Sequence, residues 1–122
     1  MNSGLDVVLK RNKNGEAISN VPRTVVHHSP TGYEWGYEGS GPADLALNIL
    51  NQAVPPRSDG LDPVKCFQGE VSVTAWLLHH DFKAEVLARI PPEGGKISAG
   101  LVQSFLRERA AQVREQAGRL SS

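Results

Sequence analysis

Residues 33–50 read YEWGYEGSGPADLALNIL, and within them the chain changes from a strand-like to a helix-like pattern. Aromatic residues at every second position predict a strand over 33–37. The glycines that follow end this pattern, and either Ser40 or Gly41 is expected to cap the start of a helix. Closely spaced apolar residues then predict a mostly buried helix over about 42–53, which two consecutive prolines end. The sequence thus predicts a strand that leads directly into a helix.

The chain before this stretch is also strand-like. Residues 5–10 place apolar side chains at every second position, and the Asn- and Gly-containing segment 12–15 predicts a turn after them. Residues 23–28 form a second run rich in β-branched residues, and the Pro- and Gly-containing segment 29–32 predicts another turn. Residues 16–22 fit either a short strand or an irregular connection. Three or four antiparallel strands are therefore expected.

Two more helices are expected after the central one. Segment 55–65 contains three prolines and a glycine, which predicts a mobile surface loop. Apolar residues spaced three or four apart predict an amphipathic helix over about 70–90, which the Pro- and Gly-rich segment 91–95 ends. Ser98 is expected to cap a last helix that runs to about Gly118.

These elements predict one α+β domain over residues 1–122, in which a small N-terminal antiparallel sheet of three or four strands precedes three helices. The length of 122 residues and the 39% hydrophobic content fit one such domain. Thirteen basic and thirteen acidic residues balance, which argues against a strongly basic nucleic-acid-binding protein. The chain has no long apolar run, and its single cysteine, Cys66, cannot form an internal disulfide. We therefore expect a cytoplasmic protein without a membrane span.

The aromatic strand and the helix start that follows it would together form a small nucleotide pocket. Side chains at alternate positions of a strand share one face, so three aromatic rings would offer a surface for stacking. Free N–H groups at a helix start suit a phosphate, although the lysine of a phosphate-binding loop is missing. The alternative is structural, because such rings commonly belong to the core and such a junction commonly serves close packing. The candidate ligand-binding residues are Tyr33, Trp35, Tyr37, Gly39, Ser40, Gly41 and Ala43.

Histidine pairs at 27–28 and 79–80 raise the question of a metal site. Adjacent residues on a strand point to opposite faces, so each pair is expected to offer at most one inward ligand. The second pair also lacks the four-residue spacing that places two ligands on one helix face. We therefore expect no metal and no cofactor. Ser40 lacks the Gly-x-Ser-x-Gly pattern of a nucleophile, and Cys66 is expected to be inert, so the sequence indicates a protein without enzymatic activity.

Charge is distributed unevenly along the chain. Residues 29–70 carry six acidic and two basic residues, whereas residues 96–122 carry five basic and two acidic ones. Either both segments are solvated faces, or they attract one another within the chain or between subunits of a homo-oligomer. The basic last helix would suit an interface with a partner protein, with Arg107 and Arg114 as the candidate contacts. Its apolar seam, expected to pack within the molecule, comprises Leu106, Ala110, Val113, Ala117 and Leu120.

Residues 29–47 read SPTGYEWGYEGSGPADLAL, and this run resembles the signature of an uncharacterised domain-of-unknown-function family common in bacteriophages and mobile elements. The resemblance continues over residues 81–91 and at the helix start near Ser98, so it covers about residues 25–107. Glu38 stands where the family is expected to have a glycine.

The resemblance implies a setting more than a mechanism, because the family has no established activity and no functional residues to transfer. Small proteins of this origin commonly bind and block a host component. The resemblance therefore implies a non-enzymatic protein that inhibits a host protein, such as a defence or CRISPR component, with no direct contact to nucleic acid or membrane. The alternative is a protein that sequesters a small phosphorylated ligand in the pocket described above.

Overall fold

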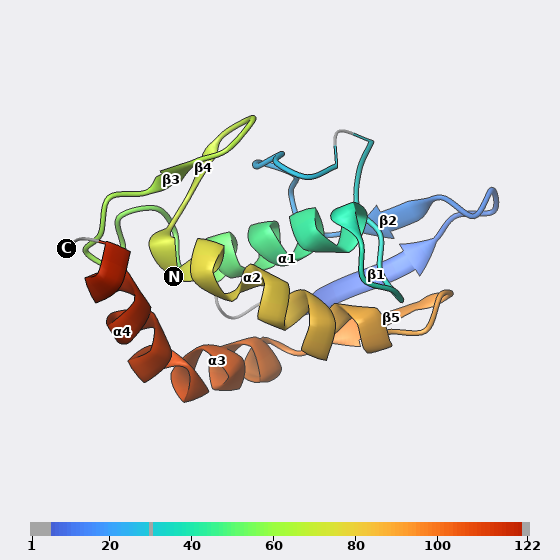
Figure 1. Ribbon diagram of the computed structural model, residues 1–122. Coiled ribbons are helices and arrows are strands. Elements are labelled where there is room, and N and C mark those ends of the chain that lie inside the picture. Colours follow the sequence, from blue (N-terminus) through green and yellow to red (C-terminus); the bar gives the residue numbers. More distant parts are fainter. Residues whose placement is uncertain (1–5, 30, 121–122) are drawn as a thin grey trace.

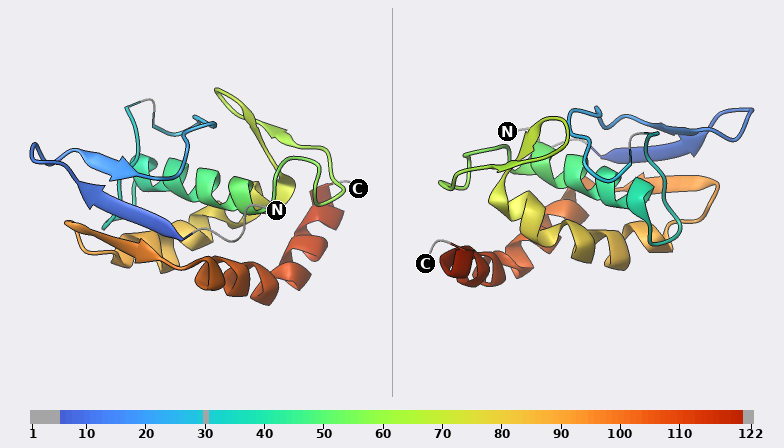
Figure 2. Two further views of the ribbon diagram at one scale, coloured as in Figure 1. Left: turned by 180° about the vertical axis from the view of Figure 1, so that it is seen from behind. Right: turned by 45° about the horizontal axis from the view of Figure 1, so that its top comes forward.

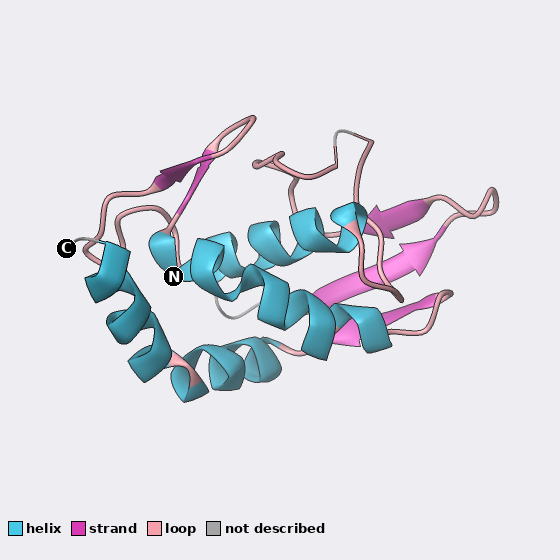
Figure 3. Cartoon of the chain, in the orientation of Figure 1, coloured by secondary structure: helices cyan, strands magenta, loops and turns pink. Residues whose placement is uncertain are grey.

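Figure 1 shows the computed structural model, which describes residues 6–29 and 31–120. Leu5, Pro30 and the side chain of Leu120, which belong to the patterns above, lie outside the described part. The sheet lies at one end of the molecule, and the last helix and a small hairpin lie at the other (Figure 3). The elements are β1 (Val7–Arg11), β2 (Ala17–Ser19), α1 (Ser40–Ala53), β3 (Val64–Lys65), β4 (Glu70–Val71), α2 (Val73–Glu85), a 3₁₀ turn (Leu87–Arg89), β5 (Gly94–Ile97), α3 (Ala99–Glu108) and α4 (Ala110–Leu120).

The protein has an α+β fold with a three-stranded antiparallel sheet, as predicted, but the third strand comes from another part of the chain. The strand order is β2-β1-β5, and β1 pairs with β5 from Val7↔Ile97 to Lys10↔Gly94. A Cβ atom at Gly94 would lie 2.2 Å from the carbonyl oxygen of Leu9. The glycines of segment 91–95 therefore end the preceding helical region and also allow a strand to approach β1 closely.

The predicted strands at 23–28 and 33–37 do not form. Residue Val26 makes a single bridge to Gln68, and no strand covers either segment. Gly36 has φ +86, a left-handed conformation that turns the chain out of the extended path, and its N–H donates to the carbonyl of Leu87 at 2.9 Å. The alternation of aromatic residues around this glycine therefore reflects a folded loop.

Helix α1 forms the centre of the core, and α2 packs along it (Figures 1 and 2). Helix α1 ends at Ala53, before the two prolines, as predicted. Its N-cap is Gly39, so the prediction of Ser40 or Gly41 as the cap is wrong by one or two residues. The sheet contributes its inward side chains to the same core. The largest fully buried apolar residues are Trp35, Leu45, Leu47, Leu50, Leu78, Phe82, Leu87 and Ile97.

Of the two predicted later helices, the first is shorter than expected and the second is divided into two. The helix expected over 70–90 is shorter, because Ser72 caps α2 by accepting a hydrogen bond from the N–H of Ala75. Ser98 caps α3 in the same way, as predicted, but the chain leaves the helix at Arg109 and α4 follows in a new direction (Figure 2). The guanidinium of Arg109 lies 4.0 Å from the ring centre of Phe105 and pairs with Glu85 of α2. The structure therefore has four helices where three were predicted.

Segment 55–65 is tied to its surroundings. The Asp59 carboxylate accepts hydrogen bonds from the N–H and hydroxyl of Thr74 at 3.0 and 2.8 Å, and Arg57 pairs with Glu70 at 2.8 Å. The last two residues of the segment form β3. The mobility of this segment stays a prediction. No helix within the described residues has the length and apolar character that crossing a membrane requires.

Candidate functional site

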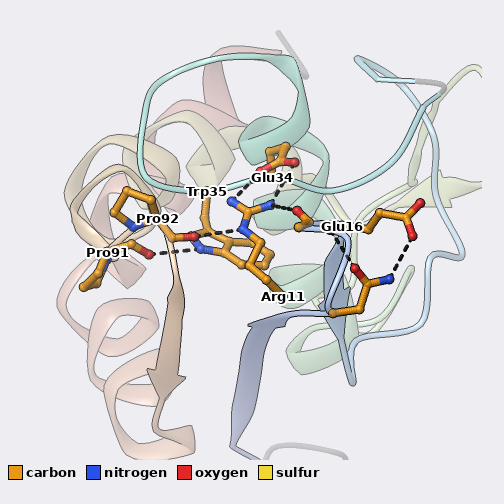
Figure 4. Close-up of polar contacts among 8 residues, drawn as sticks. Arg11, Glu16, Glu34, Trp35, Pro91 and Pro92 are labelled. Carbon is orange, nitrogen blue, oxygen red and sulfur yellow. Dashed lines mark hydrogen bonds and ion pairs between the residues drawn. The ribbon is translucent and has the colours of Figure 1, made fainter.

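Trp35 is a core residue and not a stacking surface. Its side chain is 2% exposed, and its indole N–H donates to the carbonyl of Pro91 at 3.1 Å (Figure 4). The guanidinium of Arg11 lies 4.3 Å from the ring centre, donates to the carbonyl of Pro92 at 2.9 Å and pairs with Glu34 at 2.9 Å. These contacts attach the 33–37 loop to β1 and to the turn before β5. Trp35 therefore fits the alternative prediction, that the aromatic ring belongs to the core.

The other two aromatic residues of the predicted platform lie in different environments. Tyr33 is half-buried against the core and its hydroxyl donates to the carbonyl of Pro22 at 3.0 Å, and burial raises the pKa of this phenol. Tyr37 is 51% exposed. The prediction that Tyr33, Trp35 and Tyr37 share one face is wrong, because it required a strand that the turn at Gly36 prevents.

The start of α1 packs tightly against the preceding loop. A Cβ atom at Gly41 would lie 2.8 Å from Cβ of Glu34, so the glycine is required for this approach. Ala43 is buried and donates its N–H to the carbonyl of Gly39 at 3.0 Å, whereas Ser40 is exposed. Ligand binding at this helix start stays a prediction, and Tyr37 is the exposed aromatic residue of the three beside it.

Replacing Gly41 by alanine is expected to lower the free energy of unfolding by about 2 kcal/mol, because the added methyl group meets the backbone and Cβ of Glu34. Gly100 is the matched control. It lies in α3, where the nearest atom to an added Cβ is 3.9 Å away, so Gly100→Ala is expected to stabilise by about 0.5–1 kcal/mol. Urea unfolding of both variants measures these effects, and equal effects would contradict the account of Gly41.

Two buried polar residues of α1 hold the 24–29 segment in place. Asp44 is fully buried, and its carboxylate accepts hydrogen bonds from the N–H groups of His27, His28 and Ser29, the last two at 2.8 Å. One turn later, the Asn48 amide accepts from the N–H of Thr24 and Val25 and donates to the carbonyl of Val25. The roles of Asp44 and Asn48 in holding this segment were not predicted from the sequence. Two polar residues four apart on an otherwise apolar helix were the available signal.

This arrangement brings His28 to α2, where it meets the second histidine pair. Nε2 of His28 lies 3.0 Å from Nε2 of His79, and one ring nitrogen from each of His28, His79 and His80 lies within 4.8 Å of the others. The rings of His79 and His80 are 4.0 Å apart between centroids. The prediction that each pair offers at most one inward ligand is therefore wrong for the second pair, because His79 and His80 lie in a helix and both approach His28, whereas the first pair contributes His28 alone to this group.

The three histidines differ in burial and share a preference for the neutral form. His79 is 1% exposed, and burial lowers its pKa to about 4. Burial also lowers the pKa of His28 and of His80, and the nearby positive charge of Lys83 acts in the same direction on all three. All three rings are therefore mainly neutral at pH 7 and keep an unprotonated nitrogen.

Cys66 lies in surroundings that disfavour its thiolate form. Its side chain is half-buried, and burial raises the pKa of its thiol, which keeps it protonated at neutral pH. Among the described residues, the group suited to hold a metal consists of the three histidines and does not include this cysteine.

An apolar groove of about 470 Å³ lies between α4, the start of α2 and segment 54–61. The seam predicted for the last helix is packed in part, since Val113 is buried while Leu106 and Ala110 are half-buried and line the groove. Arg114 is exposed and also lines it, and Arg107 is exposed next to Leu106. The apolar residues that line the groove are Val54, Leu61, Leu106, Ala110, Val113 and Ala117. Asp59, Thr74 and Arg114 contribute polar side chains to the lining.

Comparison with known protein families identifies a match for part of the chain. A model described as a family of unknown function, DUF6166, matches residues 2–71, which is more than half of the 122 residues. The chain belongs to this family. The DUF6166 match begins earlier than the resemblance seen in the sequence and ends before α2, so it includes β1 and β2 and leaves out residues 72–107. No curated protein and no solved structure shows a significant match.

Some of the structural features described above lie within the residues matched by the DUF6166 model, and others lie outside them. Trp35, Asp44, Asn48 and His28 lie inside it. His79, His80 and the helices α3 and α4 lie outside it, as does most of the groove lining. The buried polar network of α1 is therefore part of the DUF6166 region, whereas the groove and two of the three clustered histidines depend on the chain that follows.

Proposed function

We propose that this protein acts by binding another protein through the groove beside α4, and not by catalysis. The observation that carries the proposal is the groove itself, in which half-buried apolar side chains of Leu61, Leu106 and Ala110 lie beside the exposed guanidinium of Arg114. An apolar surface with basic residues at its edge is typical of a protein interface.

The chemistry of the groove indicates an amphipathic, acidic segment as its occupant. Apolar side chains of such a segment would fill the space between α4 and segment 54–61, in the way that a helix lies in a groove. Residues 96–122 carry five basic and two acidic residues, so carboxylates of the partner would face Arg107 and Arg114. Charge complementarity of this kind raises the rate of association and fixes the orientation of the partner.

The resemblance to proteins of bacteriophages and mobile elements supports a host protein as the partner. In that setting the bound protein would be inhibited, and a defence or CRISPR component is the kind of target expected. Helix α4, which lines the groove, lies at the end of the molecule opposite the β1–β2 hairpin (Figure 1), so a partner bound beside α4 would leave the sheet uncovered.

Reversing both charges, Arg107→Glu with Arg114→Glu, is expected to reduce the amount of partner captured from a bacterial lysate at least about tenfold. Both side chains are exposed, so the domain should keep its fold, which circular dichroism checks. The measurement is the quantity of co-purifying protein per mole of tagged chain.

Lys13→Glu is the matched control, because Lys13 is exposed at the tip of the β1–β2 hairpin, at the other end of the molecule from α4. This variant should capture the partner as well as the unmodified chain does. Equal capture by the double arginine variant would place the interface elsewhere, and loss of capture by the Lys13 variant would show that charge alone, and not the groove, governs binding.

A further inference from the structure

We propose that His28, His79 and His80 form a binding site for one divalent transition-metal ion of the zinc class. The three side chains come from two segments that are about fifty residues apart in the sequence, and each offers a ring nitrogen within 4.8 Å of the other two. Imidazole nitrogens are preferred ligands of zinc, copper and nickel, whereas magnesium and calcium prefer oxygen ligands. Three neutral imidazoles match the ligand set of a zinc ion that keeps a fourth position open.

The distances suit a single ion. Two Zn–N bonds of about 2.0–2.1 Å at a tetrahedral angle separate their nitrogens by about 3.3 Å. The Nε2 atoms of His28 and His79 are 3.0 Å apart, so they need to separate by only a few tenths of an ångström. The ligand nitrogens of all three residues lie within 4.8 Å of one another, so a tetrahedral ion requires the side chain of His80, which is exposed, to rotate toward the other two.

The structure already orients the buried ligand. The ring nitrogen Nδ1 of His79 lies 2.7 Å from the carbonyl oxygen of Trp76. A carbonyl can only accept, so Nδ1 carries the proton and Nε2 of the neutral ring keeps a lone pair directed at His28. A metal-binding histidine commonly donates its second N–H to a backbone carbonyl in this way, which fixes both the tautomer and the ring.

His28 is positioned through its backbone. Its N–H donates to the buried Asp44 carboxylate at 2.8 Å, which holds this part of the 24–29 segment against α1. In the metal-free protein, Nε2–H of His28 donates to Nε2 of His79. Metal binding replaces this hydrogen bond, and the proton of neutral His28 then resides on Nδ1. Asp44 is thus a positioning residue for the site and not a ligand.

The site would join two parts of the fold, the 24–29 segment and α2, which in the metal-free protein meet through the hydrogen bond between His28 and His79. The segment that carries His28 has no regular strand, and α2 carries the other two ligands. An ion bound to all three would fasten the segment to the helix and would stabilise the folded state by mass action. Because His80 is exposed, the open coordination position is accessible to water or to a partner's side chain.

The test uses the untagged full chain after treatment with a chelator, titrated with Co²⁺ and Zn²⁺ at pH 7.5. One equivalent of each ion should bind, Co²⁺ should produce the visible absorption of a low-coordinate site, and saturating Zn²⁺ should raise Tm by about 5–10 °C. Mg²⁺ at the same concentration should leave Tm unchanged. The absence of Zn²⁺ binding, or an equal response to Mg²⁺, would overturn the proposal.

Variants locate the ion. His80→Ala and His28→Ala each remove one ligand at an exposed or half-buried position, and each should weaken Co²⁺ and Zn²⁺ binding at least about 100-fold. His27→Ala is the matched control, because it removes the exposed neighbour of His28 and none of the three ligands. It should change the affinity by less than about threefold. Unchanged affinity in His80→Ala and His28→Ala, or a comparable loss in His27→Ala, would overturn the assignment, and circular dichroism verifies that each variant is folded.

Discussion

Replacing Asp44 by alanine is expected to lower the free energy of unfolding by about 4 kcal/mol. The carboxylate is fully buried and accepts hydrogen bonds from three consecutive backbone N–H groups, of His27, His28 and Ser29. Alanine leaves these donors without their partner, and each buried donor that loses its hydrogen bond costs about 1–3 kcal/mol. Urea unfolding at pH 7, followed by circular dichroism, measures the effect.

Two further variants show whether the loss of stability comes from the hydrogen bonds of the Asp44 carboxylate. Asp44→Asn keeps one acceptor oxygen but brings an NH₂ group toward backbone donors, so an intermediate loss of about 2 kcal/mol is expected. Asp62→Ala removes an exposed carboxylate from segment 55–65 and should change the free energy of unfolding by less than about 0.5 kcal/mol. A loss below about 1 kcal/mol for Asp44→Ala would contradict the role assigned to this carboxylate.

Trp35→Ala is expected to destabilise the protein by about 4 kcal/mol, in the range found when a large buried aromatic residue is truncated. The substitution removes the indole from the core and deletes its hydrogen bond to Pro91 and its contact with Arg11. Thermal unfolding with and without urea measures the loss. Trp35 is among the candidate ligand-binding residues predicted from the sequence, but its burial makes this variant a test of stability.

Tyr37→Ala provides the comparison for this second prediction. Its side chain is 51% exposed, so its truncation should alter the free energy of unfolding by less than about 1 kcal/mol. If a nucleotide does bind at the start of α1, Tyr37 is the residue of the aromatic trio whose loss should abolish binding in a folded protein. Equal destabilisation by the two substitutions would show that Trp35 is not the core residue described.

The sequence was sufficient to predict the elements whose signals are local. The end of α1 before two prolines, the Ser98 cap of α3 and the α+β class all follow from residues near the feature itself. Gly36 and Gly94 show where such reasoning fails. One glycine folds the aromatic segment into a loop and the other starts a strand beside β1, and in both cases the neighbouring chain, which is distant in sequence, determines the outcome.

The candidate sites depend still more on distant contacts. Arg114 was predicted as a partner contact from charge alone, and the groove it lines exists only because segment 54–61 lies against α4. The histidine cluster was not predicted, because residues adjacent in the sequence were assigned to opposite faces. The sequence near each pair also does not reveal that Asp44 holds the segment of His28 beside α2, where His28 meets the buried His79 and the exposed His80.

A native mass spectrum of the chain captured gently from a bacterial lysate tests the central claim, that this protein acts by binding another protein at α4. The account predicts a stoichiometric mass excess equal to that of one host protein, present on the unmodified chain and absent from the Arg107→Glu, Arg114→Glu variant. A spectrum showing only the chain's own mass, or the same protein excess on both samples, would contradict it. An excess of a few hundred daltons released on denaturation would replace the proposal with a small phosphorylated ligand.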